Sequence, residues 1–139
     1  MRVRRLPFEG TYSILAACDN RGGCLLLDFL NGLGAGLEKD ADRMLALLER
    51  VAQQGSQRND KISHKIEGDI WEFIQGRLRV FYFYDEGRLV VCTHGFVKKT
   101  QKAPKGEIAT ANRVREQYLA AKRQGLLDIE DEADGKENV

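Results

Sequence analysis

Apolar residues recur at helical spacing in the segment that runs from Leu37 to Ala52. Intervals of three and four residues place them on one side of a helix, with charged residues on the opposite side. The apolar positions are Leu37, Ala41, Met44, Leu45, Leu48, Val51 and Ala52. This pattern predicts an amphipathic helix that covers a hydrophobic core, and nothing in it indicates catalysis.

Three apolar segments follow in the second half of the chain, at about residues 70–74, 77–84 and 88–97. Each is short and rich in β-branched and aromatic residues, as strands are. Gly76 separates the first two segments, and the cluster at residues 85–87 separates the last two. Because such short connections join neighbouring antiparallel strands, the three segments predict an antiparallel meander.

The remaining segments complete an α+β pattern. Residues 11–18 predict a strand that ends at a glycine-rich turn, and residues 105–124 predict a helix with one apolar side. Residues 24–33 are crowded with leucine and predict a short buried helix, although a strand fits as well. The predicted order is therefore β-α-α-β-β-β-α, with an antiparallel sheet packed against helices in a single domain over residues 1–125. The acidic segment 126–139 has few apolar residues and is expected to be disordered.

Charge is distributed unevenly along the chain, although the net charge is only +1. Residues 128–139 hold six acidic residues and one lysine, whereas residues 94–123 hold eight lysines and arginines and only two acidic residues. The positive excess is therefore concentrated in the last predicted strand of the meander, the turn after it and the last helix. A surface with this concentration of cations is suited to bind a polyanion such as RNA.

The composition also bears on cofactors and location. The three cysteines, Cys18, Cys24 and Cys92, lack the spacing of metal ligands, and no carboxylate or histidine cluster has it either. No metal or other cofactor is therefore expected. An odd number of cysteines suits a reducing compartment, and Pro7 interrupts the apolar stretch that an export signal needs. Since no apolar run reaches the length of a membrane span, we expect a cytoplasmic protein without membrane contact.

The densest group of polar and basic residues is the sequence HGFVKKTQKAP at residues 94–104. It resembles the C-terminal signature of the HigB branch of the RelE/ParE toxins, which are bacterial and phage-derived. Residues 68–73 and 76–83 are similar to the second and third strands of that family, and residues 64–118 carry the similarity. The N-terminal third agrees with the family only in pattern.

The resemblance implies a RelE/ParE-like small domain and the toxin of a type II toxin–antitoxin pair. Toxins of this branch are endoribonucleases that cleave mRNA without a metal ion, usually on the translating ribosome. The implied partners are a protein antitoxin, expected to be of the helix-turn-helix type, together with mRNA and the ribosome.

Individual roles follow from the resemblance position by position. Arg79 aligns with an arginine of the family's third strand, and its planar fork suits the charged phosphorane of the transition state. Lys98 and Lys99 are expected to hold phosphate or, for one of them, to act as the base. His94 is a further candidate base or ribosome contact, although a lone histidine after a strand is often structural. The remaining candidate RNA-binding residues are Arg77, Tyr82, Tyr84, Thr100, Gln101 and Lys102.

Some of these assignments have structural alternatives. Arg79 alternates with Phe81 and Phe83, so it lies either at the rim of the core or where the strand twists. Tyr82 and Tyr84 share one strand face, and aromatic residues in strands more often pack within the core or across strands than bind RNA. His64 is assigned no role.

One position departs from the family pattern. Many members have an arginine two residues after the glutamate of the second strand, where this chain has Ile74. Ile74 removes a cation, although Arg77 is close enough in sequence to replace it. A catalytically degenerate phage-derived homologue that only binds an antitoxin therefore stays open. A ParE-like toxin that binds gyrase also stays open, because it shares the fold without nuclease chemistry.

Overall fold

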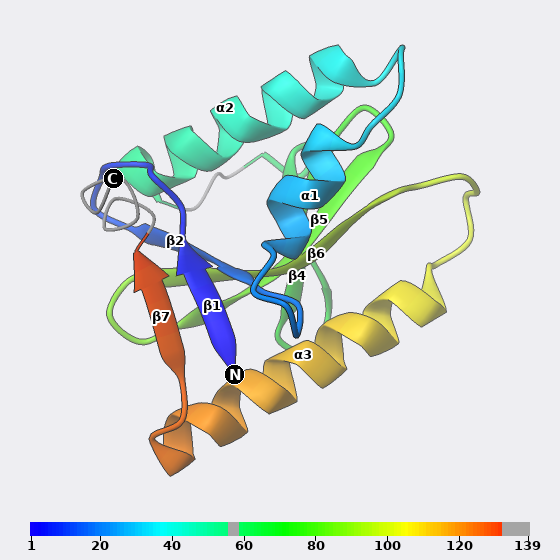
Figure 1. Cartoon of the computed structure of the whole chain (residues 1–139). Coiled ribbons are helices and arrows are strands. Elements are labelled where there is room, and N and C mark those ends of the chain that lie inside the picture. The colour runs from blue at the N-terminus through cyan, green and yellow to red at the C-terminus, as the bar shows by residue number, and fades with distance from the viewer. Residues whose placement is uncertain (56–58, 132–139) are drawn as a thin grey trace.

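The structure is a computed structural model that describes residues 1–55 and 59–131. Seven strands and three helices form in this part of the chain (Figure 1). In chain order they are β1 (Arg2–Arg5), β2 (Ser13–Ala17), α1 (Leu25–Asn31), α2 (Glu38–Gln54), β3 (Ser63–Glu67), β4 (Ile70–Gln75), β5 (Leu78–Asp85), β6 (Leu89–Val97), α3 (Lys105–Gln124) and β7 (Asp128–Asp131). No helix within these ranges is long and apolar enough to cross a membrane.

All the described strands belong to one mixed sheet with the order β3-β4-β5-β6-β2-β1-β7. The strands β3 to β6 form an antiparallel meander whose turns contain Gly68, Gly76 and Gly87, all with positive φ. β2 pairs parallel with β6, and β1 pairs antiparallel with β2 and parallel with β7. The sheet therefore brings the first and the last described strands together at one edge.

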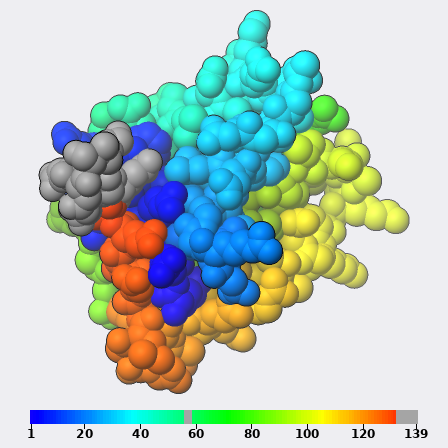
Figure 2. All heavy atoms as spheres, viewed as in Figure 1, coloured from blue at the N-terminus to red at the C-terminus, as the bar shows by residue number. Residues whose placement is uncertain are grey.

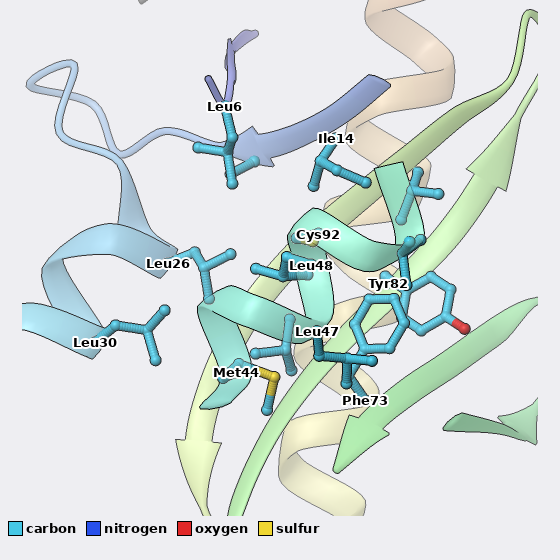
Figure 3. Close-up of a cluster of buried hydrophobic side chains, with 14 of the residues drawn as sticks. Leu6, Ile14, Leu26, Leu30, Met44, Leu47, Leu48, Phe73, Tyr82 and Cys92 are labelled. Atoms are coloured by element: carbon cyan, nitrogen blue, oxygen red, sulfur yellow. The ribbon is translucent and has the colours of Figure 1, made fainter. Parts of the chain in front are cut away.

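The first hydrophobic core lies between the sheet and the helices α1 and α2. From the sheet, Phe73 and Tyr82 stack with their ring centroids 3.9 Å apart and their planes inclined by 11°. Figure 3 shows these rings beside Met44, Leu47 and Leu48 of α2. Since a helix gains most of its stability by packing an apolar side, this core explains the helical pattern of the sequence.

The second hydrophobic core lies on the other face of the sheet, under α3. Alternation along β5 places Val80 and Tyr82 in the first core and Phe81 and Phe83 in the second. From α3, Tyr118 packs edge-on against Phe83, with the ring centroids 5.3 Å apart. The central strands are thus covered on both faces, by α1 and α2 on one side and by α3 on the other (Figure 1).

Asp85 anchors α3 to the end of β5. The Tyr118 hydroxyl donates to Asp85 Oδ2 at 2.6 Å, and Lys122 Nζ donates to both carboxylate oxygens at 3.0 Å. Burial acts to raise the pKa of Asp85, but the hydrogen bonds from Tyr118 and Lys122 outweigh it and lower the pKa below its ordinary value of 3.8. The carboxylate is therefore stabilised in its charged form in the folded protein.

We expect Asp85→Asn to lower the free energy of unfolding by about 1–2 kcal/mol at neutral pH. Because the folded-state pKa of Asp85 lies below the unfolded one, its contribution is present above that unfolded value and disappears as the pH falls through the folded one. Urea unfolding at about pH 7 and at about pH 2.5 measures the difference between variant and wild type. A deficit of equal size at both pH values would contradict a role for the charge.

Most of the predicted elements are confirmed. The helices predicted from Leu37 and over residues 105–124 are α2 and α3, and the short helix within residues 24–33 is α1. The strand predicted within residues 11–18 is β2, and the meander is β4, β5 and β6. The α+β class is therefore right. The predicted order β-α-α-β-β-β-α is wrong, because it lacks β1, β3 and β7, and the sheet is mixed rather than antiparallel.

The edge strand β7 is joined to its neighbour β1 by ion pairs as well as by backbone pairing. Arg2 Nε lies 3.1 Å from Glu130 Oε1, and Arg4 Nη2 lies 3.6 Å from Glu130 Oε2. Because these contacts are ionic, neither strand shows the alternation of apolar and polar residues by which strands are predicted from a sequence. The expectation of disorder from residue 126 is therefore wrong for Asp128–Asp131, and residues 132–139 lie outside the described residues.

Candidate functional site

A bulge at Thr93 changes the direction in which the last residues of β6 point. Cys92 pairs with Tyr82 and His94 pairs with Phe81, so Thr93 has no opposite residue in the β5–β6 register, although its hydroxyl donates to the Phe81 carbonyl at 3.3 Å. Cys92 lies in the core under α1 and α2, whereas His94 bonds to a residue of α3 on the other face. Because side chains alternate with a period of two, one inserted residue moves all later side chains to the opposite face.

The imidazole of His94 connects β6 to the start of α3. Its Nε2 donates to Glu107 Oε2 at 2.7 Å, since a carboxylate only accepts, and its Nδ1 lies 3.0 Å from the Thr93 hydroxyl. The ring also lies against Phe81 and Phe96, with centroids 5.8 Å away in both cases. Both ring nitrogens are therefore engaged within the protein, and the side chain is only 14% exposed.

Glu72 of β4 is a buried carboxylate on the same face of the sheet. Its Oε1 lies 3.0 Å from His64 Nε2, and its Oε2 lies 3.9 Å from Arg79 Nε. Burial raises the pKa of Glu72 above its ordinary value, although the charges of His64, Arg79 and Lys98 act to lower it. With a raised pKa, the Glu72 carboxyl group keeps its proton up to a higher pH than an exposed glutamate does.

Arg79, at the start of β5, is fixed by the turn before it. Its Nη1 donates to the carbonyl oxygens of Gly76 and Leu78 at 2.8 and 3.0 Å. Its Nε is buried and has no hydrogen-bond partner within the described part of the chain. A buried donor without a partner is rare in folded proteins and suits a ligand with an acceptor oxygen.

Arg79 lines an open pocket of about 410 Å³ together with the two candidate catalytic lysines and three of the six residues predicted for RNA binding. Backbone pairing joins two of its lining residues, because the Lys98 amide donates to the Arg77 carbonyl at 2.8 Å. Its lining residues are Arg77, Arg79, Lys98, Lys99, Thr100 and Gln101. We call it the cationic pocket. Figure 2 shows the segment that follows β6, in yellow, projecting from the body of the protein at this place.

Lys102 lines a second, neighbouring pocket, whereas the two tyrosines lie away from both. Tyr82 is completely buried in the first core, where its hydroxyl lies 2.7 Å from the Ser63 hydroxyl. Tyr84, which is 38% exposed, packs edge-on against Tyr82. No base can stack on a buried ring, so the structure favours the packing alternative for Tyr82.

Ile74 lies directly opposite Arg79 in the β4–β5 ladder. A residue at this position is the cross-strand neighbour of Arg79, within reach of the same ligand. Many members of the family that the sequence resembles have an arginine at this position, so Ile74 leaves Arg79 without that neighbouring cation. Arg77, two residues before Arg79, lines the cationic pocket and supplies a positive charge there.

Three residues of the site were not candidates from the sequence: His64, Glu72 and Glu107. Backbone register aligns His64, Glu72, Phe81 and His94 in one row across four strands. The signal in the sequence is a charged residue inside the apolar strand β4, because a buried carboxylate requires partners. The identity of those partners depends on strand register, which the sequence did not show.

Potential metal ligands do not gather anywhere in the described ranges. No group of three or more histidine, cysteine, aspartate or glutamate side chains in residues 1–55 and 59–131 is arranged to hold a metal ion.

Comparison with known proteins identifies the family of the chain. A family model described as "Phage derived protein Gp49-like (DUF891)" matches residues 28–116, which is more than half of the chain. The matched segment runs from α1 into α3 and includes the cationic pocket, Glu72, His94 and Glu107. No curated protein matches the chain.

Proposed function

Because the chain belongs to the Gp49-like family of phage-derived proteins, which is part of the RelE/HigB-type toxin family, we propose that it is an mRNA endoribonuclease toxin of a type II toxin–antitoxin pair. Membership in a toxin–antitoxin family implies an antitoxin partner. The endoribonuclease activity is the part that we propose from the site.

The observation that carries this proposal is the cationic pocket. Two arginines and two lysines line a volume of about 410 Å³, and one of them, Arg79, has a buried Nε without a hydrogen-bond partner in the described residues. Cleavage of RNA without a metal needs cations that stabilise a charged phosphorane, a base for the 2′-hydroxyl and an acid for the leaving 5′-oxygen. The pocket supplies the first of these three requirements.

In the proposed reaction, Arg79 stabilises the phosphorane, and Lys98 and Lys99 hold the neighbouring phosphate oxygens. Proton transfer is assigned to the residues beside the pocket. His64 has 38% of its side chain exposed, more than His94, and its Nε2 lies 3.0 Å from Glu72 Oε1. Its Nδ1 lies 3.2 Å from the Asp60 carbonyl oxygen, so His64 takes up a proton from a substrate only after this contact at the surface opens. A histidine oriented by a buried carboxylate is a common arrangement for a group that moves protons.

His94 is proposed as a positioning residue rather than as the base. Its two ring nitrogens contact Thr93 and Glu107, so neither is available to a substrate without a rearrangement. By bonding to Glu107, it fixes the end of β6 against α3. The residues that follow β6, Lys98 and Lys99, depend on this position for their place in the pocket.

Expression of the chain without its antitoxin tests the proposal. We expect arrested growth with cleaved transcripts, and relief of both by Lys98→Ala combined with Lys99→Ala. The matched control is Arg21→Ala combined with Arg50→Ala, which removes two exposed arginines outside the pocket. Undisturbed growth with intact mRNA on expression of the wild type would count against the nuclease.

The lysine pair also gives a prediction for RNA binding by the purified protein. Each phosphate neutralised on single-stranded RNA contributes about −0.7 to the slope of log K against log salt concentration. Lys98→Ala with Lys99→Ala is therefore expected to make this slope shallower by about 1.4, whereas the control pair leaves it unchanged. Fluorescence anisotropy of a labelled oligonucleotide between about 50 and 300 mM salt measures the slope. An unchanged slope would show that these lysines do not contact phosphate.

Dependence on the ribosome is a separate part of the proposal. Cleavage of free mRNA is compared with cleavage of the same mRNA on translating ribosomes in a purified translation system. We expect cleavage only when ribosomes translate the message, because the exposed cations of the pocket also suit ribosomal RNA. Equal cleavage in both reactions would remove the ribosome as a required partner.

A second candidate function is antitoxin binding without cleavage. The observation that favours it is Ile74, which places an apolar side chain beside Arg79. Co-purification with an antitoxin of the helix-turn-helix type, together with intact RNA and normal growth, would select this function.

A further inference from the structure

A second pocket, of about 530 Å³, lies beside the cationic pocket at an open edge of β6. β2 pairs with β6 only as far as Cys92, so the last residues of β6 have a strand neighbour on one side only, within the described part of the chain. The volume lies in the range of about 300–1,000 Å³ that is usual for small-molecule sites. Its lining residues are Phe29, Gly95, Phe96, Val97, Lys98, Lys99, Thr100, Lys102, Pro104 and Glu107. We call it the edge pocket.

Two aromatic rings contribute to the edge pocket, from different elements. Phe29 of α1 lies directly on the backbone of Gly95, since a Cβ at Gly95 would lie only 2.5 Å from Phe29 Cδ2. Phe96 is held on the other face of the sheet by an edge-on contact with Phe81, with centroids 5.0 Å apart. Both rings are only partly buried, so each exposes apolar surface to the pocket.

The backbone of β6 adds polar groups at the same place. The Lys98 amide points towards β5, where it donates to Arg77. Because N–H and C=O groups alternate between the two sides of a strand, those of Gly95 and Val97 point towards the open edge. A planar ligand that stacks on an aromatic ring can therefore also form hydrogen bonds with these backbone groups through its edge.

The charges of the edge pocket suit an anionic ligand that carries a hydrogen-bond donor. Lys98, Lys99 and Lys102 supply positive charge. The single carboxylate is Glu107, whose side chain is 40% exposed and whose Oε2 is bonded to His94. The other oxygen, Oε1, can accept a hydrogen bond from a ligand. Lys98, Lys99 and Thr100 line both pockets, so one ligand can occupy the two together.

We propose that the edge pocket binds an unpaired RNA base that carries an exocyclic amino group, while the phosphate next to that base occupies the cationic pocket. Single-stranded RNA is commonly recognised by stacking of a base on an aromatic ring and by hydrogen bonds to its edge. Phe29 provides the stacking surface, and Glu107 accepts from the amino group. This inference rests on the proposed function, which identifies the ligand as RNA. It adds a site for the base, the part of a nucleotide that gives sequence preference.

A peptide segment of the antitoxin is the other occupant to consider. A peptide that extends the sheet needs a free edge several residues long, whereas only Gly95 and Val97 point outwards here, between α1 and α3. The three lysines of the pocket favour a ligand with a phosphate group, which a peptide strand lacks. The structure therefore favours the base.

The test is a titration of the full-length protein with nucleoside 5′-monophosphates, followed by NMR chemical shifts. CMP and UMP differ at one edge position, amino against carbonyl, and ribose 5-phosphate lacks the base. We expect CMP to bind about fivefold more tightly than UMP, and both to bind more tightly than ribose 5-phosphate. The largest shifts are expected at Phe29, Gly95 and Phe96.

Phe29→Leu is the decisive variant, because leucine keeps an apolar residue on α1 but removes the ring. We expect its affinity for CMP to fall roughly tenfold, as for the loss of one base–aromatic contact, with no change for ribose 5-phosphate. Leu25→Ala is the matched control, since Leu25 is also a partly exposed apolar residue of α1 but does not line the edge pocket. Arg79→Ala is expected to weaken binding of CMP and ribose 5-phosphate alike.

The outcomes separate this inference from the proposed function. Equal binding of CMP and ribose 5-phosphate, or an unchanged affinity in Phe29→Leu, overturns the base site even if the wild type cleaves RNA. The expected nucleotide affinities without any RNA cleavage support the base site and count against the nuclease. Shifts at Phe29 and Gly95 that occur with the antitoxin but with none of the nucleotides would assign the edge pocket to a protein segment and overturn the inference.

Discussion

Arg79→Ala is expected to reduce RNA cleavage by about 100- to 1,000-fold, the loss usual for one group that stabilises a charged transition state. The guanidinium is held by two backbone carbonyls, and its Nε lies 3.9 Å from Glu72 Oε2 without a hydrogen-bond partner in the described residues. A donor fixed in this way does not have to reorganise when charge develops on the phosphate. Gel analysis of a defined transcript on translating ribosomes, with wild-type and variant protein, measures the loss.

Three further variants separate catalysis from folding. Arg79→Lys keeps the charge but not the planar fork, so it is expected to restore only a small part of the activity. Arg79→Ala combined with Glu72→Gln removes the carboxylate that would otherwise lose its arginine partner, and thermal unfolding shows whether the double variant is folded. Arg113→Ala removes an arginine outside the cationic pocket and is expected to retain full activity. Cleavage at the wild-type rate by a folded Arg79→Ala protein would exclude the assigned role.

Phe73→Ala is expected to lower the free energy of unfolding by about 3–5 kcal/mol. Phe73 is 1% exposed and stacks on Tyr82 at 3.9 Å, under the apolar side of α2 (Figure 3). Its removal leaves a cavity that Tyr82 cannot fill without breaking its bond to Ser63. Urea unfolding followed by circular dichroism measures the change.

Tyr84→Ala is the matched control for Phe73→Ala. Tyr84 is an aromatic residue of the neighbouring strand β5 but is 38% exposed, so we expect a loss of less than about 1.5 kcal/mol. If the two variants lost the same stability, burial in the first core would not be the reason for the effect at Phe73.

The helices and the central strands could be predicted because each has a local signal. The apolar residues of α2 recur at helical spacing, and the strands of the meander are separated by glycine turns. The last helix was predicted with its observed ends, since Pro104 precedes it and Gly125 follows it. These signals act within a few residues of the chain, where sequence reasoning is strongest.

The parallel pairings could not be predicted, because they join residues that are far apart in the chain. β2 pairs with β6 across both helices and most of the meander, and no residue of β2 marks that neighbour. β1 and β7 have one fully buried side chain between them, that of Val3, so alternation gives no signal there. Their attraction is partly ionic, between arginines and acidic residues that also occur on ordinary exposed surfaces.

The candidate site was predictable only where its residues are consecutive. Lys98 and Lys99 stand together in the sequence and line one pocket in the structure. Glu72 and His64 reach Arg79 through strand register, which the sequence does not specify. The bulge at Thr93 also decides the outcome for His94, because without it His94 would face the core under α1 and α2. The single bulged residue Thr93 thus determines on which face of the sheet the His94 side chain lies.

The pairing of β1 with β7 also sets the order in which the sheet is completed during translation. β1 is synthesised long before β7, and its outer neighbour is formed by Asp128–Asp131. Until those residues emerge from the exit tunnel, the nascent chain presents β1 as an open strand edge, which is prone to pair with other chains. The emergence of Asp128–Asp131 is therefore also the step that protects the nascent chain against aggregation along this edge.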